Sequence, residues 1–248
     1  MKKIVIKLSG EALSGKGEFF DDNVLEKITG QLRQLSGTQI SLVVGGGNFW
    51  RGRTAKNKFF LNRSRSDQIG MLGTVMNGIY LSEYFKRAGL PAYVMTPFAV
   101  GAFTQIFSRE DALRLMAEGA VVIHTGGTGH PYFSTDTAAA LRAAELDADC
   151  VFYAKNVDGV YEADPREKPE ARKYRRVSYQ IMIDRGLKAI DTAAMAISQE
   201  AGVDSYVFGL EEENSIPRAF AAFSQPVGAG VNNIGTKITT ACEEDFYV

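Results

Sequence analysis

Short apolar runs recur along the chain at intervals that leave room for a helix between them. Five such runs, at residues 4–8, 40–44, 92–96, 121–124 and 151–153, have the length of buried parallel strands. Glycine or other loop-forming residues follow closely after several of them. The pattern therefore predicts a sheet whose strands are buried on both faces.

The segments between these runs have helical spacing. Leu25, Ile28, Leu32 and Leu35 form one apolar stripe, and Asp22 precedes them as a candidate N-cap. Further helices are predicted at residues 67–87, 112–118, 138–146, 179–185 and 192–201, and further strands at 205–208 and 234–239. This alternation predicts an α/β fold, a three-layer α/β/α sandwich with a mainly parallel central sheet covered by helices on both faces.

The pattern changes after residue 153. Residues 157–165 are rich in turn formers, and residues 166–176 are so highly charged that we expect them to be exposed. The sequence is interpreted as a single domain, 1–248, with an N-terminal lobe at 1–150 and a C-terminal lobe at 151–248.

Composition narrows the classes of function. Lys plus Arg total 28 and Asp plus Glu total 29, so the charge balance does not favour nucleic-acid binding. Cys150 and Cys242 lack metal-ligand spacing and fit a reducing cytoplasm. Lys7 and Glu11 interrupt any signal-peptide core, and the glycines and prolines of residues 88–108 argue against a membrane span. We expect a cytoplasmic protein with no membrane partner.

Three glycine clusters follow predicted strands, at residues 7–10, 45–48 and 126–129. Parallel strands end at a common edge of their sheet, and glycines let backbone N–H groups approach a phosphate closely. The last cluster leads into a helix near Ser134, whose N-terminus adds positive potential. Neither the usual P-loop nor the dinucleotide-binding pattern is present. Together the three clusters predict one phosphate-rich site.

The order and spacing of these motifs resemble the amino-acid kinase family, and within it the bacterial branch whose acceptor is UMP. The similar segments are residues 7–13, 45–52, 67–78, 126–141 and 157–164. The resemblance implies ATP-dependent phosphorylation of UMP to UDP in pyrimidine nucleotide synthesis, with Mg²⁺ accompanying ATP and no dedicated protein metal site. It also implies a homohexamer. A carboxylate or carbamate kinase, or a non-enzymatic protein that binds oxyanions, remains an alternative.

The resemblance also assigns catalytic roles. It implies that the ammonium group of Lys7 bridges the transferring phosphoryl oxygens and that Asp136 holds Lys7 by charge pairing. Asp191 is expected to extend this polar network. Lys155 is interpreted either as a second phosphate-contacting lysine or as a solvated one.

Both nucleotide sites follow from the same resemblance. The implied ATP site consists of Lys7, Leu8, Ser9, Gly10, Gly47, Arg51, Lys155, Tyr161 and Asp164. The implied UMP site consists of Gly46, Arg51, Asp67, Thr128, Gly129, His130, Pro131, Tyr132, Phe133, Ser134 and Thr135. Asp67 has the alternative role of a helix cap. His130 replaces the more usual asparagine, which leaves selectivity among UMP, CMP and dUMP open, as is regulation by GTP or UTP.

Overall fold

The computed structural model describes residues 1–15, 18–50, 61–225 and 234–247. Its strands are β1 Lys3–Leu8, β2 Gln39–Val44, β3 Ala92–Thr96, β4 Gln105–Ile106, β5 Val121–His124, β6 Cys150–Lys155, β7 Tyr174–Ser178, β8 Asp204–Gly209, β9 Thr236–Thr239 and β10 Asp245–Phe246. Its helices are the 3₁₀ helix η1 Glu11–Leu13, α1 Asp22–Arg33, α2 Arg63–Arg87, α3 Arg109–Ala117, α4 Thr135–Glu145, α5 Tyr179–Asp184, α6 Thr192–Glu200 and α7 Ser215–Ser224.

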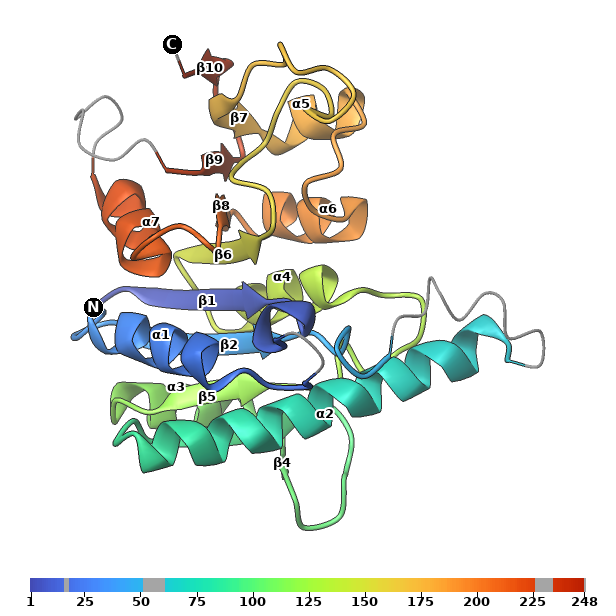
Figure 1. Cartoon of the computed structure of the whole chain (residues 1–248), viewed down its shortest axis with the longest axis vertical. Coiled ribbons are helices and arrows are strands. Elements are labelled where there is room, and N and C mark those ends of the chain that lie inside the picture. The colour runs from blue at the N-terminus through green and yellow to red at the C-terminus, as the bar shows by residue number, and fades with distance from the viewer. Residues whose placement is uncertain (16–17, 51–60, 226–233, 248) are drawn as a thin grey trace.

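The described strands form one ten-stranded sheet in the order β10-β7-β9-β8-β6-β1-β2-β5-β3-β4, with helices on both faces (Figure 1). The pairs β7–β10 and β8–β9 are antiparallel, and the other neighbours are parallel. The mainly parallel α/β/α sandwich is thereby confirmed. Because β6 pairs with both β1 and β8, the sheet is continuous across residue 150, and the division into lobes stays a prediction.

Strand β1 illustrates why the apolar runs are continuous. Ile4, Ile6 and Leu8 pack with α1, α2 and α7 on one face of the sheet, and Val5 packs with α4, α5 and α6 on the other. Side chains alternate between faces along a strand, so both faces need apolar residues. By the same alternation Lys7 lies on the face of Val5, beneath α4.

Several helix starts differ from the sequence prediction. Helix α2 has Asn62 as its N-cap, so the prediction that Asp67 opens this helix is wrong, and Asp67 lies in its second turn. Helix α1 is capped by the side chain of Asp21 rather than Asp22. Helix α3 begins three residues before the predicted start, at Arg109, and its N-cap is Ser108, whose hydroxyl accepts a hydrogen bond from the backbone N of Asp111 at 3.3 Å.

The charged segment 166–176 is only partly exposed, which corrects the expectation. Its end forms β7, where Tyr174 is fully buried and stacks on Phe246 with ring centroids 4.4 Å apart. Helix α7 was not predicted, although Pro217 in its first turn is compatible with a helix start. Both elements depend on partners distant in sequence.

Helix α2 runs along the sheet and extends past the carboxyl ends of β1 and β2 (Figure 1). No described helix, α2 with its 25 residues included, is apolar enough over a sufficient length to cross a membrane. Gly78 lets α2 lie close to the sheet, because a Cβ atom added there would be 2.3 Å from Cγ2 of Thr125 and 3.2 Å from Cγ1 of Val94. Gly30 in α1 has no such neighbour within 4 Å.

We therefore expect opposite effects from alanine at these two helical glycines. Gly78→Ala overpacks the interface and lowers the free energy of unfolding by about 1–3 kcal/mol. Gly30→Ala only removes backbone freedom and raises it by about 0.5–1 kcal/mol. Urea denaturation followed by circular dichroism measures both values. Equal changes in the two variants would contradict the packing argument.

Candidate active site

The glycine clusters that follow β1 and β2 are packed against each other at the carboxyl edge of the sheet. A Cβ atom added to Gly10 would lie 2.6 Å from the backbone N of Gly47 and 2.8 Å from the carbonyl oxygen of Gly45. Similarly, a Cβ on Gly46 would lie 2.5 Å from the carbonyl oxygen of Gly70 in α2. Only glycine permits these approaches. The loops that the sequence predicted to share a site are therefore neighbours.

Two lysines on adjacent strands share one carboxylate beside these loops. Lys7 ends β1 on the α4 face, and Lys155 ends β6 on the same face, because Val151 and Tyr153 of β6 also pack there. The Nζ of Lys7 is 3.0 Å from Oδ1 of Asp136, and the Nζ of Lys155 is 2.5 Å from Oδ2. The side chains of Lys7, Lys155 and Asp136 are 8%, 19% and 9% exposed. The structure thus contains the Lys7–Asp136 pair that the resemblance implied, and it adds Lys155, whose role the sequence had left open, to the same carboxylate.

Asp136 is held by the local structure of α4. The hydroxyl of Ser134, the N-cap, accepts hydrogen bonds from the backbone N of Asp136 at 3.1 Å and of Thr137 at 3.3 Å. The hydroxyl of buried Tyr153 donates to the carbonyl oxygen of Asp136 at 3.2 Å. The carboxylate is therefore fixed through its backbone on two sides, which sets its position between the lysines.

Burial and neighbouring charges shift the pKa values of Asp136 and Lys155 in opposite directions. Burial alone would raise the pKa of Asp136, but Lys7 and Lys155 outweigh it and hold the pKa below the ordinary 3.8. Burial lowers the pKa of Lys155, and the charge of Asp136 partly opposes that shift. Two ammonium groups and one carboxylate leave a net positive formal charge facing the glycine loops. Such a charge suits a phosphate ligand.

A cavity of about 300 Å³ opens between α2 and the loop after β5. Of the residues implied for UMP, those that line it are Gly46, Asp67, Phe133, Ser134 and Thr135. Trp50 and Met71 line it too, and no sequence argument had singled them out. Thr128, Gly129, His130 and Pro131 belong to the same loop but do not line this cavity. The backbone N of Tyr132, which does not line it either, donates to Oδ2 of Asp67 at 2.8 Å.

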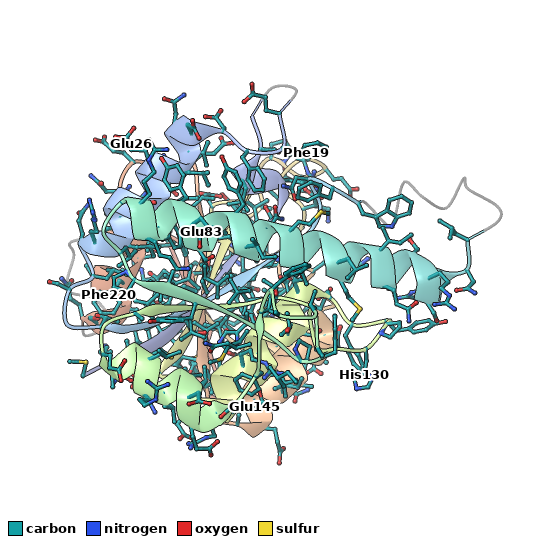
Figure 2. All side chains as sticks on the ribbon, turned by 90° about the horizontal axis from the view of Figure 1, so that it is seen from below. Phe19, Glu26, Glu83, His130, Glu145 and Phe220 are labelled. Carbon is teal, nitrogen blue, oxygen red and sulfur yellow. The ribbon has the colours of Figure 1, made fainter. Side chains whose placement is uncertain are left out.

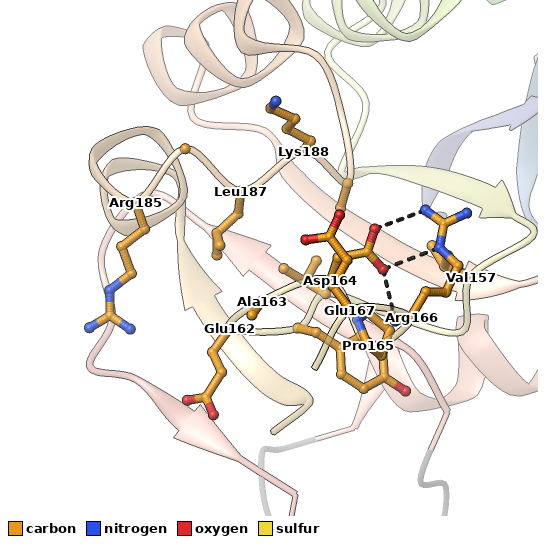
Figure 3. A pocket seen from close by; sticks show the side chains of 15 residues that line it. Val157, Glu162, Ala163, Asp164, Pro165, Arg166, Glu167, Arg185, Leu187 and Lys188 are labelled. Atoms are coloured by element: carbon orange, nitrogen blue, oxygen red, sulfur yellow. Dashed lines mark hydrogen bonds and ion pairs between the residues drawn. The ribbon is translucent and has the colours of Figure 1, made fainter. Parts of the chain in front are cut away.

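Tyr161 and Asp164, two of the residues implied for ATP, line a separate pocket of about 420 Å³ that does not include Lys155 (Figure 3). There the guanidinium of Arg166 donates to both carboxylate oxygens of Asp164, at 3.1 and 3.0 Å. The hydroxyl of Tyr161 donates to Asp158 at 2.8 Å, and burial followed by this bond raises the pKa of Tyr161 to about 12. Leu8 and Ser9 accompany Lys7 and Gly10 at the end of β1.

Two further predicted residues, Asp191 and Arg51, are not part of the cluster or cavities described above. Asp191 is the exposed N-cap of α6, and its negative charge favours the protonated form of Lys155. Arg51, implied for both nucleotides, lies outside the described residues. Within the described part of the chain, no three His, Cys, Asp or Glu side chains gather in a way that would hold a metal ion.

Sequence reasoning missed two polar residues of α2 that hold the loops. The side-chain nitrogen of Asn77, which is fully buried, donates to the carbonyl oxygen of Gly45 at 2.6 Å and to Oδ1 of Asn48 at 2.8 Å. The hydroxyl of Thr74 accepts from the backbone N of Gly126 at 2.7 Å. Helix α2 thereby connects two of the three glycine clusters. The available signal was a pair of polar residues three positions apart within a helix.

Comparisons with known proteins agree with this geometry. The model of the amino acid kinase family matches residues 2–209. The uridylate kinase of Pediococcus pentosaceus is 40% identical over 241 residues, which cover 96% of each chain. The crystal structure of UMP kinase from Bacillus anthracis superposes with a TM-score of 0.90 at 28% identity, covering 100% of this chain and 99% of that one. UMP kinase from Ureaplasma parvum gives 0.87 at 29% identity, covering 96% and 98%.

Replacing the shared carboxylate should destabilise the fold as well as the site. Asp136→Asn leaves two buried ammonium groups without a counter-charge, and we expect it to lower the free energy of unfolding at pH 7 by about 3–5 kcal/mol. Adding Lys155→Met removes one of these charges and should restore part of the loss. Urea denaturation of the wild type, both single variants and the double variant forms the test.

The same variants have a defined pH dependence. The pKa of Asp136 is lowered in the folded protein. The contribution of this carboxylate to the free energy of unfolding is therefore fully present above about pH 3.8, and it is lost as the pH falls through the lowered pKa. The difference in the free energy of unfolding between wild type and Asp136→Asn should therefore be constant near neutral pH and decrease below about pH 4. A gap that shrinks between pH 7 and pH 5 would contradict this assignment.

Proposed function

Because the chain belongs to the amino acid kinase family, we propose that it transfers the γ-phosphoryl group of ATP to UMP, which yields ADP and UDP. The observation that carries the proposal is the Lys7–Asp136–Lys155 cluster beside the packed glycine loops. The acceptor cavity next to those loops and the similarity to UMP kinases favour a nucleotide acceptor over a carboxylate or carbamate. The similarity to UMP kinases also favours an enzyme over a non-enzymatic protein that only binds oxyanions.

The reaction needs positioning more than acid–base chemistry. The second pKa of a phosphate monoester is about 6, so the acceptor oxygen of UMP is already anionic at neutral pH. Charge builds up on the oxygens of the transferring phosphoryl group and requires cations and backbone N–H donors held in place. Lys7 and Lys155 supply that positive charge, and Asp136 keeps both lysines aligned. Gly10 lets backbone N–H donors come close to the phosphoryl group.

Mg²⁺ enters this proposal as part of the donor nucleotide. Asp136 is occupied by two lysines, and the described residues form no other acidic cluster at the site. Mg²⁺ binds readily through phosphate oxygens and water, with few protein ligands. It would neutralise charge on the ATP phosphates, while the lysines act on the group being transferred.

We further propose that the two nucleotides bind to different segments of the chain. The acceptor cavity is lined by residues from 46 to 135, within the segment 1–150, and Tyr161 and Asp164 lie in the segment 151–248. This supports UMP binding by the first segment and ATP binding by the second. We also propose a cytoplasmic location, as expected from the sequence, and a role in pyrimidine nucleotide synthesis, which the proposed reaction would serve.

We also propose that the protein is a homo-oligomer, a hexamer by its family resemblance. Ile69, Leu72, Met76 and Tyr80 recur on one face of α2 and are 37%, 52%, 47% and 40% exposed. A contiguous apolar face of this kind on a soluble helix is typical of a protein–protein contact. We call these four residues the α2 stripe and propose that it forms part of the contact between subunits.

A charge within the α2 stripe should weaken this assembly. Met76→Glu places a carboxylate in the apolar contact and is expected to lower the molar mass measured by light scattering after gel filtration. Gln34→Glu adds the same charge at the exposed C-cap of α1 and should leave the mass unchanged. A wild-type monomer, or unchanged assembly in Met76→Glu, would refute the role of the stripe.

The proposed reaction is tested with purified protein, Mg²⁺-ATP and a panel of nucleoside monophosphates in a coupled ADP-release assay. We expect kcat/KM for UMP to exceed that for AMP and GMP by orders of magnitude. Lys7→Ala should lower kcat by about 10²–10³-fold, because the cation acts mainly in the transition state. Lys86→Ala removes an exposed lysine of α2 and serves as the matched control.

The possible outcomes test uracil selectivity, the role of Lys7 and phosphoryl transfer separately. Equal activity with CMP and UMP would remove uracil selectivity but keep phosphoryl transfer. A kcat for folded Lys7→Ala within a few-fold of the wild type would remove Lys7 from the mechanism. No reaction with any monophosphate would refute the proposed function.

A further inference from the structure

Tyr153 is a neighbour of both lysines of the site. It is fully buried, and in the pairing of β1 with β6 it lies directly opposite Lys7. Lys155 follows two residues later on the same strand, so its side chain leaves the same face of the sheet. The Nζ of Lys155 is 5.6 Å from the centroid of the Tyr153 ring. The Tyr153 side chain therefore belongs to the layer from which both ammonium groups project.

The hydroxyl of Tyr153 connects this layer to the helix packed on it. It donates to the carbonyl oxygen of Asp136 at 3.2 Å, in the first turn of α4. The Ser134 cap joins only neighbouring residues of the same helix start, so it fixes the shape of that turn. The bond from Tyr153 runs from β6 to α4. It therefore fixes the position of the turn relative to the strands that carry the lysines.

This bond is neutral, which distinguishes it from the ion pairs of the cluster. Burial and the charge of Asp136 raise the pKa of the Tyr153 hydroxyl well above its ordinary 10, so the hydroxyl remains a donor at neutral pH. The ion pairs, by contrast, respond to an incoming anion, because the oxygens of a transferring phosphoryl group attract the same two lysines. The Tyr153 bond can therefore hold the backbone of Asp136 in place while the lysines act on a phosphate.

We propose that Tyr153 is a positioning residue for phosphoryl transfer, which holds Asp136 where its carboxylate meets both lysines. The inference rests on the proposed function and deepens it. Tyr153 touches neither nucleotide and acts through Asp136. Because the transfer depends on charges held in place, a small displacement of these groups slows the reaction. Tyr153 therefore affects kcat rather than the binding of ATP or UMP.

The first experiment removes the hydroxyl and keeps the ring. Tyr153→Phe should lower kcat by about 10-fold, with KM for UMP and for ATP within about two-fold of the wild type. The coupled ADP-release assay measures these constants. Circular dichroism at the assay temperature verifies that the variant is folded.

Tyr179→Phe is the matched control. Tyr179 is also fully buried in the same apolar cluster, and its hydroxyl is 2.8 Å from the carbonyl oxygen of Val203 and 2.7 Å from the hydroxyl of Ser205. Both partners lie at the amino end of β8, and the glycine loops lie at the other edge of the sheet. This variant loses a buried hydroxyl outside the site, so its kcat should stay within about two-fold of the wild type. An equal loss of kcat in the two variants would assign Tyr153 a structural role and overturn the inference.

The pH dependence of kcat is a readout that a general loss of stability would not shift. Burial lowers the pKa of Lys155, and the charge of Asp136 opposes that shift. If Asp136 moves away in Tyr153→Phe, the opposition weakens and Lys155 loses its proton at a lower pH. The alkaline decrease of kcat should therefore begin at a lower pH in Tyr153→Phe than in the wild type or Tyr179→Phe. Lys7 and Asp191, whose charges also act on Lys155, are the same in all three proteins.

The results distinguish the inference from the function on which it rests. A wild-type protein that phosphorylates UMP, with kcat unchanged in Tyr153→Phe, would overturn the positioning role and leave the kinase intact. A raised KM with unchanged kcat would also overturn it, because that result would assign Tyr153 to substrate binding. A lowered kcat with an unshifted alkaline decrease would contradict a role through Asp136. If the wild type phosphorylates no monophosphate, the proposed function itself fails.

Discussion

The buried carboxylate of Asp136 between two ammonium groups is the interaction on which the centre of this structure depends. Lys7 and Lys155 come from neighbouring strands, and without Asp136 their charges would repel each other across the β1–β6 pair. With it, α4 is attached to both strands at the sheet edge. The same three side chains therefore join the layers of the fold and set the positive charge of the site.

Helix α2 has a comparable double role. Its inner face supplies Thr74 and Asn77, which hold the glycine loops, and its outer face carries the α2 stripe. Between them, toward the helix start, Ser66 and Asp67 face the acceptor cavity. The helix that crosses the molecule in Figure 2 thus carries the residues that hold the loops, two residues of the proposed acceptor cavity and the proposed subunit contact. Gly78 is needed because this element must lie close to the sheet along much of its length.

The sequence predicted the fold class and most strands because their apolar runs are continuous and their spacing is regular. The pairing of Lys7 with Asp136 was implied by the family resemblance, which left the role of Lys155 open, and the ion pair of Lys155 with Asp136 became visible only in the structure. The sequence did not predict Asn77 or Trp50 as parts of the site, because each acts through a partner 16 or more residues away, such as Gly45 or Ser66. Strand β7 was missed for the same reason.

The glycine loops and the Lys7–Asp136–Lys155 cluster differ in how they tolerate substitution during evolution. A side chain at Gly10 would strike backbone atoms of Gly45 and Gly47, and no substitution in the facing loop can remove a backbone atom. The loss of Lys155, by contrast, can be offset at Asp136 or by a new cation nearby. Descendants of this sequence are therefore expected to keep the loop glycines individually, whereas Lys155 and the charges around it are free to covary.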